Sequence, residues 1–197
     1  MLSVLIPTRD SERVLIPTLA ALVAGSAAGI VRDVLIADGG SRDDTEKIAD
    51  AAGCAFLPGP ADPGARLRAA AHTARGNWLL FLDPASVLDE GWTREVRAFT
   101  DNADRSGLAE RRAATFRLRK EGFGMKPLLA EAAAATRLAL IGRPRAEQGL
   151  LIAKRFYQSL GGHGDGETAH RRLVGRIGRR IVVLRTAITL SADSFAK

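Results

Sequence analysis

The chain has 197 residues, of which 46% are hydrophobic and 26% are charged. This length buries one substantial core, so we expect a single domain over 1–197. The net charge of +7 favours an anionic partner, but with 5% aromatic residues and no aromatic RNA-binding motif, nucleic acid is the least favoured one. The single cysteine, Cys54, excludes an internal disulfide, and no signal peptide or spanning segment is indicated, so the sequence predicts a cytoplasmic protein.

The first half of the sequence alternates strand and helix patterns. Short, continuous apolar runs that stop at proline, glycine or aspartate predict strands at 2–7, 31–38, 54–59 and 77–83. Helical spacing of apolar residues predicts helices over 11–25, 41–53 and 63–75, with Pro17 marking a late start or a kink in the first of them. Continuous apolar strands joined by helices are typical of a mostly parallel sheet covered on both faces, so we expect an α/β fold.

The second half is less regular. The patterns predict helices over 91–103, 126–142, 155–161 and 167–178, and strands over 113–120, 148–154 and 180–185. The glycine-rich segment 161–167 is expected to be a mobile loop. The basic segment 171–180 has two interpretations, a solvated helix face or a surface for a diphosphate or an anionic membrane.

Polar residues collect where the predicted parallel strands end. The segments that follow three of these strands are Pro7-Thr8-Arg9-Asp10, Asp38-Gly39-Gly40-Ser41 and Asp83-Pro84-Ala85-Ser86. Ligands of such sheets bind beyond the carboxyl ends of the strands, so we expect a pocket there. Helix capping and a tight turn also explain Asp10 and the 38–41 segment, and both interpretations stay open.

Five segments carry a resemblance to a known family. SVLIPTRDSE, VLIADGGSRDDTEKIA and GARLRAAAHTARGNWLLFLDPASVLDEGW occur in this order, followed by GRPRAEQGLLIAKRFYQSLGG and ETAHRRLVGRIGRRIVVLRTAITLSA. Together they resemble the family 2 inverting glycosyltransferases of the GT-A fold, over essentially the whole chain. The resemblance implies a Rossmann-like, mostly parallel sheet with helices on both faces. It also implies a nucleotide-sugar-binding half over about 1–100 and an acceptor half over about 101–197.

The resemblance implies a binding site for a nucleoside-diphosphate sugar at the predicted pocket. The residues expected to contact this donor are Pro7, Thr8, Asp10, Asp38, Gly39, Arg66 and Asp83. The chemistry is consistent, because a carboxylate such as that of Asp38 accepts hydrogen bonds from a uracil N–H or from ribose hydroxyls. Glycines beside it permit a close approach of the backbone.

The metal motif of the family is incomplete in this chain. In the family, the strand that matches 77–83 ends in two acids one residue apart, or in a histidine and an acid, and the second acid binds a divalent ion. That ion neutralises the charge of the departing nucleoside diphosphate. Here Asp83 occupies the first position and Ala85 the second. The resemblance therefore implies Mg²⁺ or Mn²⁺ at Asp83 without its usual ligand, and a solvated strand end is the alternative for Asp83.

The general base of the family is also displaced. Inverting transfer needs a carboxylate that takes the proton of the acceptor hydroxyl, and the family supplies it from a Glu-Asp pair before the closing helix. Counting back from that helix places Asp165 and Gly166 at the pair, with Glu167 next. Asp165 and Glu167 are thus the candidate catalytic residues, although capping or solvation also explains both. A zinc site made by Asp165 with two nearby histidines, His163 and His170, has little support from the pattern.

On the acceptor side, Glu147 and Gln148 suit the recognition of sugar hydroxyls, with a structural role as the alternative. The sequence thus predicts a glycosyltransferase that transfers a sugar, with inversion, from a nucleoside-diphosphate sugar to an acceptor that it does not identify. Peripheral association with the inner face of a membrane or with a lipid-linked acceptor is a further expectation. The alternative is a catalytically inactive relative that serves as a nucleotide-binding or interaction module, and Ala85 and Gly166 are the features that favour it.

Overall fold

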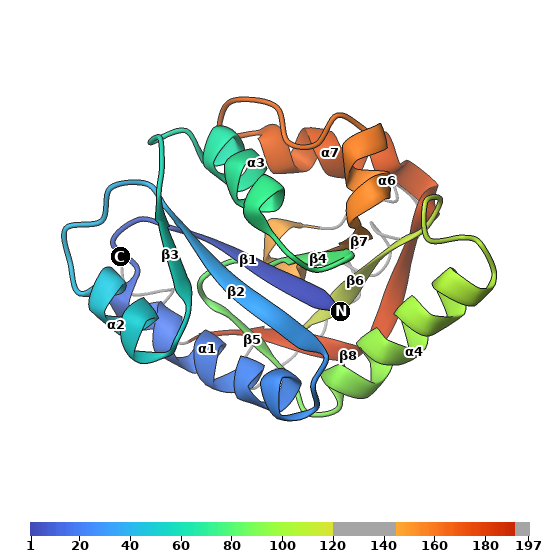
Figure 1. The fold of residues 1–197 in the computed structure, drawn as a ribbon, viewed down its shortest axis with the longest axis horizontal. Coiled ribbons are helices and arrows are strands. Elements are labelled where there is room, and N and C mark those ends of the chain that lie inside the picture. Colours follow the sequence, from blue (N-terminus) through green and yellow to red (C-terminus); the bar gives the residue numbers. More distant parts are fainter. Residues whose placement is uncertain (120–144, 192–197) are drawn as a thin grey trace, which may run out of the picture.

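The computed structural model describes residues 1–119 and 145–191, and the helix expected over 126–142 lies outside them. The described residues form an eight-stranded sheet in the order β3-β2-β1-β4-β7-β6-β8-β5 (Figure 1). Its strands are β1 (Leu2–Thr8), β2 (Val31–Asp38), β3 (Ala55–Pro58), β4 (Trp78–Phe81), β5 (Ser86–Leu88), β6 (Ala113–Arg119), β7 (Leu150–Ala153) and β8 (Ile181–Leu190).

Helices cover both faces of this sheet. The helices are α1 (Glu12–Ala27), α2 (Thr45–Ala51), α3 (Pro63–Thr73), α4 (Trp92–Arg105), α6 (Lys154–Ser159) and α7 (Ala169–Ile177), with short 3₁₀ turns η1 (Ala146–Gln148) and η2 (Gly178–Arg180). In Figure 1, α1 and α4 run along one face, and α3, α6 and α7 lie over the other. The predicted α/β class with a mostly parallel sheet is confirmed.

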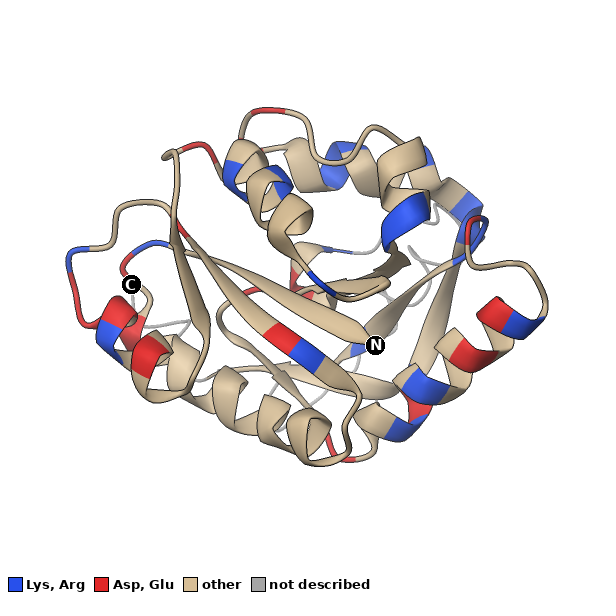
Figure 2. Ribbon diagram, viewed as in Figure 1, with Lys and Arg blue, Asp and Glu red and all other residues tan. Residues whose placement is uncertain are grey.

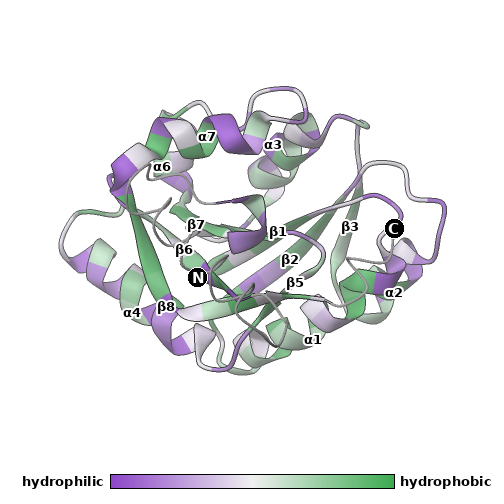
Figure 3. Cartoon of the chain, turned by 180° about the vertical axis from the view of Figure 1, so that it is seen from behind, coloured by the Kyte–Doolittle hydropathy of each residue, from purple (hydrophilic) through white to green (hydrophobic). Residues whose placement is uncertain are grey.

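The parallel part of the sheet places the strand ends of the first half side by side. β1 pairs in parallel with β2 and β4, and β2 pairs in parallel with β3. The register brings Thr8 opposite Asp38, and Asp38 opposite Pro58. β1 and β4 are almost entirely buried, as their continuous apolar runs predict, and Figure 3 shows hydrophobic residues along the strands. The carboxyl ends of β1, β2 and β3 therefore form one edge.

The second half supplies β6, β7 and β8, close to the strands predicted over 113–120, 148–154 and 180–185, whereas β5 was not predicted. β7 runs antiparallel to β4 and to β6, and β8 lies between β6 and β5. β5 has three residues, which is too short for a periodic pattern. β8 continues to Leu190, beyond the predicted end at 185, because β5 pairs with its last residues, Ser86 opposite Leu190. α1 begins at Glu12 and contains Pro17, so of the two expectations for Pro17, a late start or a kink, the late start is wrong.

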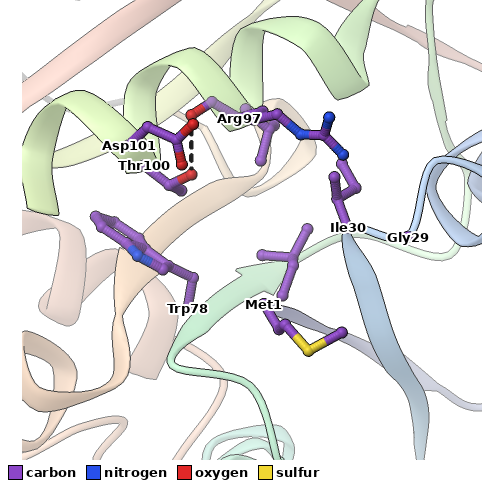
Figure 4. A pocket seen from close by; sticks show the side chains of 9 residues that line it. Met1, Gly29, Ile30, Trp78, Arg97, Thr100 and Asp101 are labelled. Atoms are coloured by element: carbon purple, nitrogen blue, oxygen red, sulfur yellow. Dashed lines mark hydrogen bonds between the residues drawn. The ribbon is translucent and has the colours of Figure 1, made fainter.

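A cavity of about 180 Å³ opens at the amino ends of β1 and β4 (Figure 4). Trp78, Arg97 and Asp101 face it. The Trp78 indole donates a hydrogen bond of 3.3 Å to Asp104, outside the cavity lining. This is the edge opposite the strand ends described above, so the cavity is separate from the expected pocket. Within the described ranges, no helix is long and apolar enough to cross a membrane.

Candidate functional site

Asp38, the last residue of β2, joins the carboxyl ends of β1 and β2. Its carboxylate accepts hydrogen bonds from the Thr8 hydroxyl at 2.9 Å, from the backbone N–H groups of Gly40 and Ser41 at 2.8 Å each, and from the Ser41 hydroxyl. Burial alone would raise the pKa of Asp38, but these hydrogen bonds outweigh it and lower the pKa below its ordinary value. Four donors fill the roughly four acceptor positions of a carboxylate, so Asp38 is charged and satisfied without a ligand.

Asp10 ties the loop after β1 to the loop after β2. Its backbone N–H donates to the Ser41 hydroxyl at 2.9 Å, and its carboxylate accepts from the backbone N–H of Arg42 at 2.7 Å. Asp10 has a φ of 49°, in the left-handed region that aspartate tolerates better than most residues. Pro7 lies one residue before Thr8 in β1, opposite Ala37. The structure thus brings Pro7, Thr8, Asp10 and Asp38 together, as the sequence predicts.

Arg66 of α3 lies over the turn that follows Asp38. A Cβ atom at Gly39 would be 2.5 Å from Nη1 of Arg66, so the guanidinium occupies the space that a side chain at position 39 would need. Arg66 is 8% exposed, and its Nη1 donates to the carbonyl of Ala61 at 2.7 Å. Its Nε is buried without a hydrogen-bond partner in the part of the chain that the structure describes. An unsatisfied buried donor costs about 1–3 kcal/mol.

Two carboxylates from different parts of the chain, those of Asp38 and Glu167, act on the charge of Arg66. Burial lowers the pKa of Arg66, whereas the charges of Asp38 and Glu167 act in the opposite direction. Arginine stays protonated in proteins, so a positive charge is held here beside a permanent carboxylate. Among the described residues, the buried Nε–H of Arg66 has no hydrogen-bond partner.

Asp83 lies two residues beyond β4 and is half-buried. One of its oxygens accepts from the backbone N–H of Ala85 at 3.0 Å. Burial, reinforced by the charge of Glu147, raises the pKa of Asp83 above its ordinary value. No group of three or more His, Cys, Asp or Glu side chains that could hold a metal ion occurs in residues 1–119 and 145–191. The structure therefore places Asp83 near one other carboxylate, that of Glu147.

Glu147 and Gln148 lie in η1, next to β7. Gln148 is buried, its Oε1 accepts from the Arg145 backbone at 2.9 Å, and its Nε2 donates to the carbonyl of Phe116 at 3.0 Å. Both ends of the Gln148 amide are thus used by the backbone. The side chain of Glu147 is half-buried, and its backbone carbonyl accepts from Ser86 at 3.1 Å. Of this pair, Glu147 is the residue whose charge acts on Asp83.

The glycine-rich segment 161–167 is held by several arginines, which the sequence alone did not indicate. Arg68 of α3 donates to the carbonyl of His163 at 2.8 Å. Arg176 of α7 donates to the carbonyls of Leu160 and Gly162, and Arg172 donates to that of Asp165. Arg172 and Arg176 of the basic segment 171–180 thus bind backbone oxygens, which the interpretation as a solvated helix face did not include. Figure 2 shows the basic residues over α3, α6 and α7.

The two candidate bases differ in their surroundings. The Asp165 carboxylate forms an ion pair with Arg68 at 2.8 Å, and both side chains are partly exposed. Glu167 is exposed, and its charge acts on Arg66 across the pocket edge. Gly166 lies between them with a φ of 92°, and its N–H donates to Asp62, which also caps α3. An acid at position 166 would be strained in this conformation, which explains the glycine.

A family comparison settles the class of the chain. The model described as "Glycosyl transferase family 2" matches residues 3–133, well over half of the sequence. The chain belongs to glycosyl transferase family 2. This membership confirms the family that the sequence resembles. A comparison with curated proteins finds no match.

Solved structures share the fold of this glycosyltransferase at low identity. S. aureus TarS 1-349 is 13% identical with a TM-score of 0.68, and the match covers 98% of this chain and 60% of that one. TarS 1-349 in complex with UDP-GlcNAc is 14% identical with a TM-score of 0.65, covering 95% and 58%. Glucosyl-3-phosphoglycerate synthase from Mycobacterium tuberculosis, in complex with Mn²⁺, UDP and glucosyl-3-phosphoglycerate, is 18% identical with a TM-score of 0.63, covering 97% and 70%. The chain thus spans about three fifths of the length of TarS 1-349.

A buried histidine of the 161–167 segment, His163, lies against a partly buried histidine of α7, His170. The Tyr157 hydroxyl accepts from the backbone N–H of His163 and lies 3.0 Å from its Nδ1. The other ring nitrogen of His163, Nε2, lies 3.2 Å from Nδ1 of His170, within hydrogen-bonding distance. Because Asp165 pairs with Arg68 instead, it does not join the two histidines.

Both histidines are held neutral. Burial, followed by the charges of His170, Arg176 and Arg68, lowers the pKa of His163 to about 3. Burial lowers the pKa of His170 to about 4. Both folded values lie below the ordinary value of 6.5, so the unfolded chain takes up protons at a higher pH than the folded glycosyltransferase does.

We expect the neutral histidines His163 and His170 to make the free energy of unfolding decrease as the pH falls. The stability that depends on neutral His163 is fully present above the unfolded pKa and is lost as pH falls toward the folded value. Between about pH 7.5 and about pH 5, His163 alone should lower the free energy of unfolding by roughly 2 kcal/mol. Urea unfolding across this range measures the effect. His163→Gln should flatten the pH dependence, and the exposed His72→Gln should not; equal curves for His163→Gln and the parent would contradict the assignment.

Proposed function

We propose that this glycosyltransferase binds a nucleoside-diphosphate sugar at the carboxyl ends of β1 and β2 and transfers the sugar with inversion. The observation that carries the proposal is the buried Nε–H of Arg66, which lacks a partner among the described residues and lies beside a carboxylate whose own partners are complete. An oxygen of the donor nucleotide would accept this hydrogen bond. Binding would then remove a penalty that the free protein carries.

The neighbouring residues have supporting roles in this proposal. We assign Pro7, Thr8 and Asp10 to the wall of the donor pocket, and Asp38 to holding the turn at its floor. Gly39 leaves the space that the Arg66 guanidinium fills. The complexes of TarS with UDP-GlcNAc and of the mycobacterial synthase with UDP support a uridine nucleotide as the first donor to test. The donor half would cover about 1–100 and the acceptor half about 101–197.

The family also implies a divalent cation, and the mycobacterial synthase binds Mn²⁺ with UDP. Asp83 has one oxygen that no backbone donor occupies, and Glu147 is near enough for its charge to act on Asp83. Carboxylate oxygens of this kind suit hard cations such as Mg²⁺ and Mn²⁺. We propose that Asp83, with Glu147 beside it, would hold the cation, which when bound would neutralise charge on the leaving diphosphate.

Glu167 is the better placed of the two candidate bases. During transfer, the acceptor oxygen bonds to the anomeric carbon as the bond to the diphosphate oxygen breaks on the opposite face. The base takes the acceptor proton, and the nucleoside diphosphate leaves with the electron pair of the broken bond. Asp165 must break its ion pair with Arg68 to act in this way, whereas Glu167 carries no ion pair in the described part of the chain. We therefore assign the proton transfer to Glu167 and the positioning of the loop to Asp165.

An anionic acceptor or membrane surface fits the basic segment 171–180, which spans most of α7 and all of η2. Arg172, Arg176 and Arg180 donate to backbone carbonyls, but Arg171 and Arg179 are exposed and donate no hydrogen bond to the described residues. These two side chains are available to phosphate groups. We propose them as the contact to a lipid-linked or otherwise anionic acceptor.

Arg66→Lys tests the donor site. The substitution keeps a positive charge but removes the Nε–H, so we expect the affinity for UDP to fall roughly ten- to hundredfold. Isothermal titration of UDP into the parent and the variant measures this. Arg32→Lys, an exposed change at the amino end of β2, is the matched control and should bind as the parent does. Equal affinity of Arg66→Lys and the parent would remove the support for this pocket.

Glu167→Gln tests the base. Release of UDP from UDP-sugars, with water as the acceptor, should slow by roughly a hundredfold or more in kcat, while the affinity for UDP stays unchanged. Asp165→Asn should reduce kcat by less than about tenfold, because its carboxylate positions the loop rather than the proton. A larger loss for Asp165→Asn than for Glu167→Gln would move the base to Asp165.

Asp83→Asn tests the cation. We expect Mn²⁺ to strengthen UDP binding by the parent, since a cation neutralises the diphosphate, and we expect this gain to vanish in Asp83→Asn. Binding of UDP in the presence of a chelator should be the same in both proteins. Calorimetric titrations with and without Mn²⁺ give the comparison. A gain that persists in Asp83→Asn would contradict the assigned ligand.

A further inference from the structure

The carboxylate of Asp62 joins two elements that the proposed reaction uses. Asp62 is the N-cap residue of α3, and one of its oxygens accepts a hydrogen bond from the backbone N–H of Ala65 at 2.6 Å. Its other oxygen accepts from the backbone N–H of Gly166, in the segment 161–167. Capping needs only the first of these bonds. The second bond, which spans 104 residues of sequence, is therefore not explained by the helix end.

The charge of Asp62 suits two simultaneous donors. The hydrogen bond from Ala65, together with that from Gly166 and the charges of Arg68 and Arg66, lowers the pKa of Asp62 below its ordinary value. The group is therefore an anion at neutral pH and offers each donor an oxygen that carries no proton. A neutral amide at this position would have only one acceptor oxygen.

The first turn of α3 also packs directly on the backbone of the 161–167 segment. A Cβ atom at Gly64 would overlap the carbonyl oxygen of Gly164 and lie 2.6 Å from the Cβ of Ala169, so the approach requires glycine. Arg68, about one turn further along α3, donates to the carbonyl of His163 at 2.8 Å. The helix and the segment are therefore in contact on both sides of the donor-binding residue at position 66.

Gly166 is held from its other side by α7, which lies beside α3 (Figure 1). Its carbonyl accepts from the backbone N–H of Ala169, the first residue of α7, at 3.0 Å. Both polar groups of the Gly166 backbone are thus engaged, one by each helix. Glu167 follows directly in sequence, is exposed, and has a charge that acts on Arg66. Bonds to its neighbour therefore fix the backbone of Glu167, while the residue itself stays accessible.

The same end of α3 fixes Arg66. The backbone N–H of Arg66 donates to the carbonyl of Asp62 at 3.1 Å, and its Nη1 donates to the carbonyl of Ala61 at 2.7 Å. The backbone of residues 61 and 62 thus holds the arginine that we assign to the donor, and the Asp62 carboxylate holds the backbone next to the base. One short stretch of chain therefore sets both positions.

We propose that Asp62 is a positioning residue for the proton transfer, because it holds Gly166, and through it Glu167, against the helix that carries Arg66. This inference rests on the proposed function, in which Glu167 is the base and Arg66 binds the donor. The base must reach the acceptor oxygen within hydrogen-bonding distance, and a displacement of about 1 Å can cost roughly a hundredfold in rate. In this proposal Asp62 contacts neither the sugar nor the acceptor.

Asp62→Asn and Asp62→Ser test this role. Asparagine and serine are both good N-cap residues, so α3 should be retained. Asparagine has one acceptor oxygen and serine is shorter than aspartate, so neither satisfies Ala65 and Gly166 together. For release of UDP from a UDP-sugar, we expect kcat to fall roughly tenfold while the affinity for UDP stays unchanged. Asp44→Asn, the same change at the N-cap of α2, is the matched control and should alter neither value.

Two further measurements separate positioning from a general loss of structure. Amide hydrogen exchange of the 161–167 segment should become several-fold faster in the Asp62 variants, while exchange of α1 stays as in the parent. In a Glu167→Gln background, Asp62→Asn should cause no further loss of kcat, because a positioning residue acts only through the group that it positions.

Three results would overturn the proposal and leave Glu167 as the base. They are an unchanged kcat in both Asp62 variants, a fall in UDP affinity as large as the fall in kcat, and a full additional loss of kcat in the Glu167→Gln background. Failure of the proposed base has a different signature, since Glu167→Gln would then keep the kcat of the parent. That result would overturn the role of Asp62 together with the role of Glu167.

Discussion

The hydrogen bonds that converge on the Asp38 carboxylate are the constraint on which the donor edge depends. They join the end of β1, through Thr8, to the turn after β2, through Gly40 and Ser41. Because the carboxylate is fully used in this way, the turn has one shape and Gly39 faces Arg66. The guanidinium packs over this turn, and its Nε–H has no partner among the described residues. Asp38 thus holds the turn, and Arg66 carries the hydrogen-bond donor that is left over.

The departures from the family pattern have physical explanations at the level of single residues. Gly166 stands where the family pattern leads us to expect an acid, and its backbone is left-handed. Of the neighbouring acids, Asp165 pairs with Arg68, and Glu167 forms no ion pair with the described residues. Ala85 replaces the usual metal ligand, and its backbone N–H holds Asp83 in place. A permanent cation, Arg66, stands at the donor edge in addition. These features are compatible with an active glycosyltransferase.

The sequence predicted the parallel half of the fold because short, continuous apolar runs, such as those that end at Pro7 and Asp38, are typical of strands buried on both faces of a parallel sheet. It did not reveal β5 or the full length of β8, whose pairing depends on partners distant in sequence. The positions of polar residues after the strands predicted a pocket at this edge, whereas the individual donor contacts, Arg66 among them, were implied only by the family resemblance. The sequence did not predict the unpartnered Nε of Arg66 or the arginine contacts to the 161–167 segment. Every residue has a backbone carbonyl, so the sequence does not show which carbonyls accept hydrogen bonds from side chains. Asp43, which accepts from the N–H of Glu12 at the start of α1, was missed for the same reason.

A crystal structure of the enzyme with UDP tests the central claim most directly. The account predicts that the nucleotide lies at the carboxyl ends of β1 and β2, with one of its oxygens within hydrogen-bonding distance of the Arg66 Nε and with the Asp38 turn unchanged. A nucleotide bound at any other edge of the sheet, or one that leaves Arg66 Nε without a partner, would contradict it.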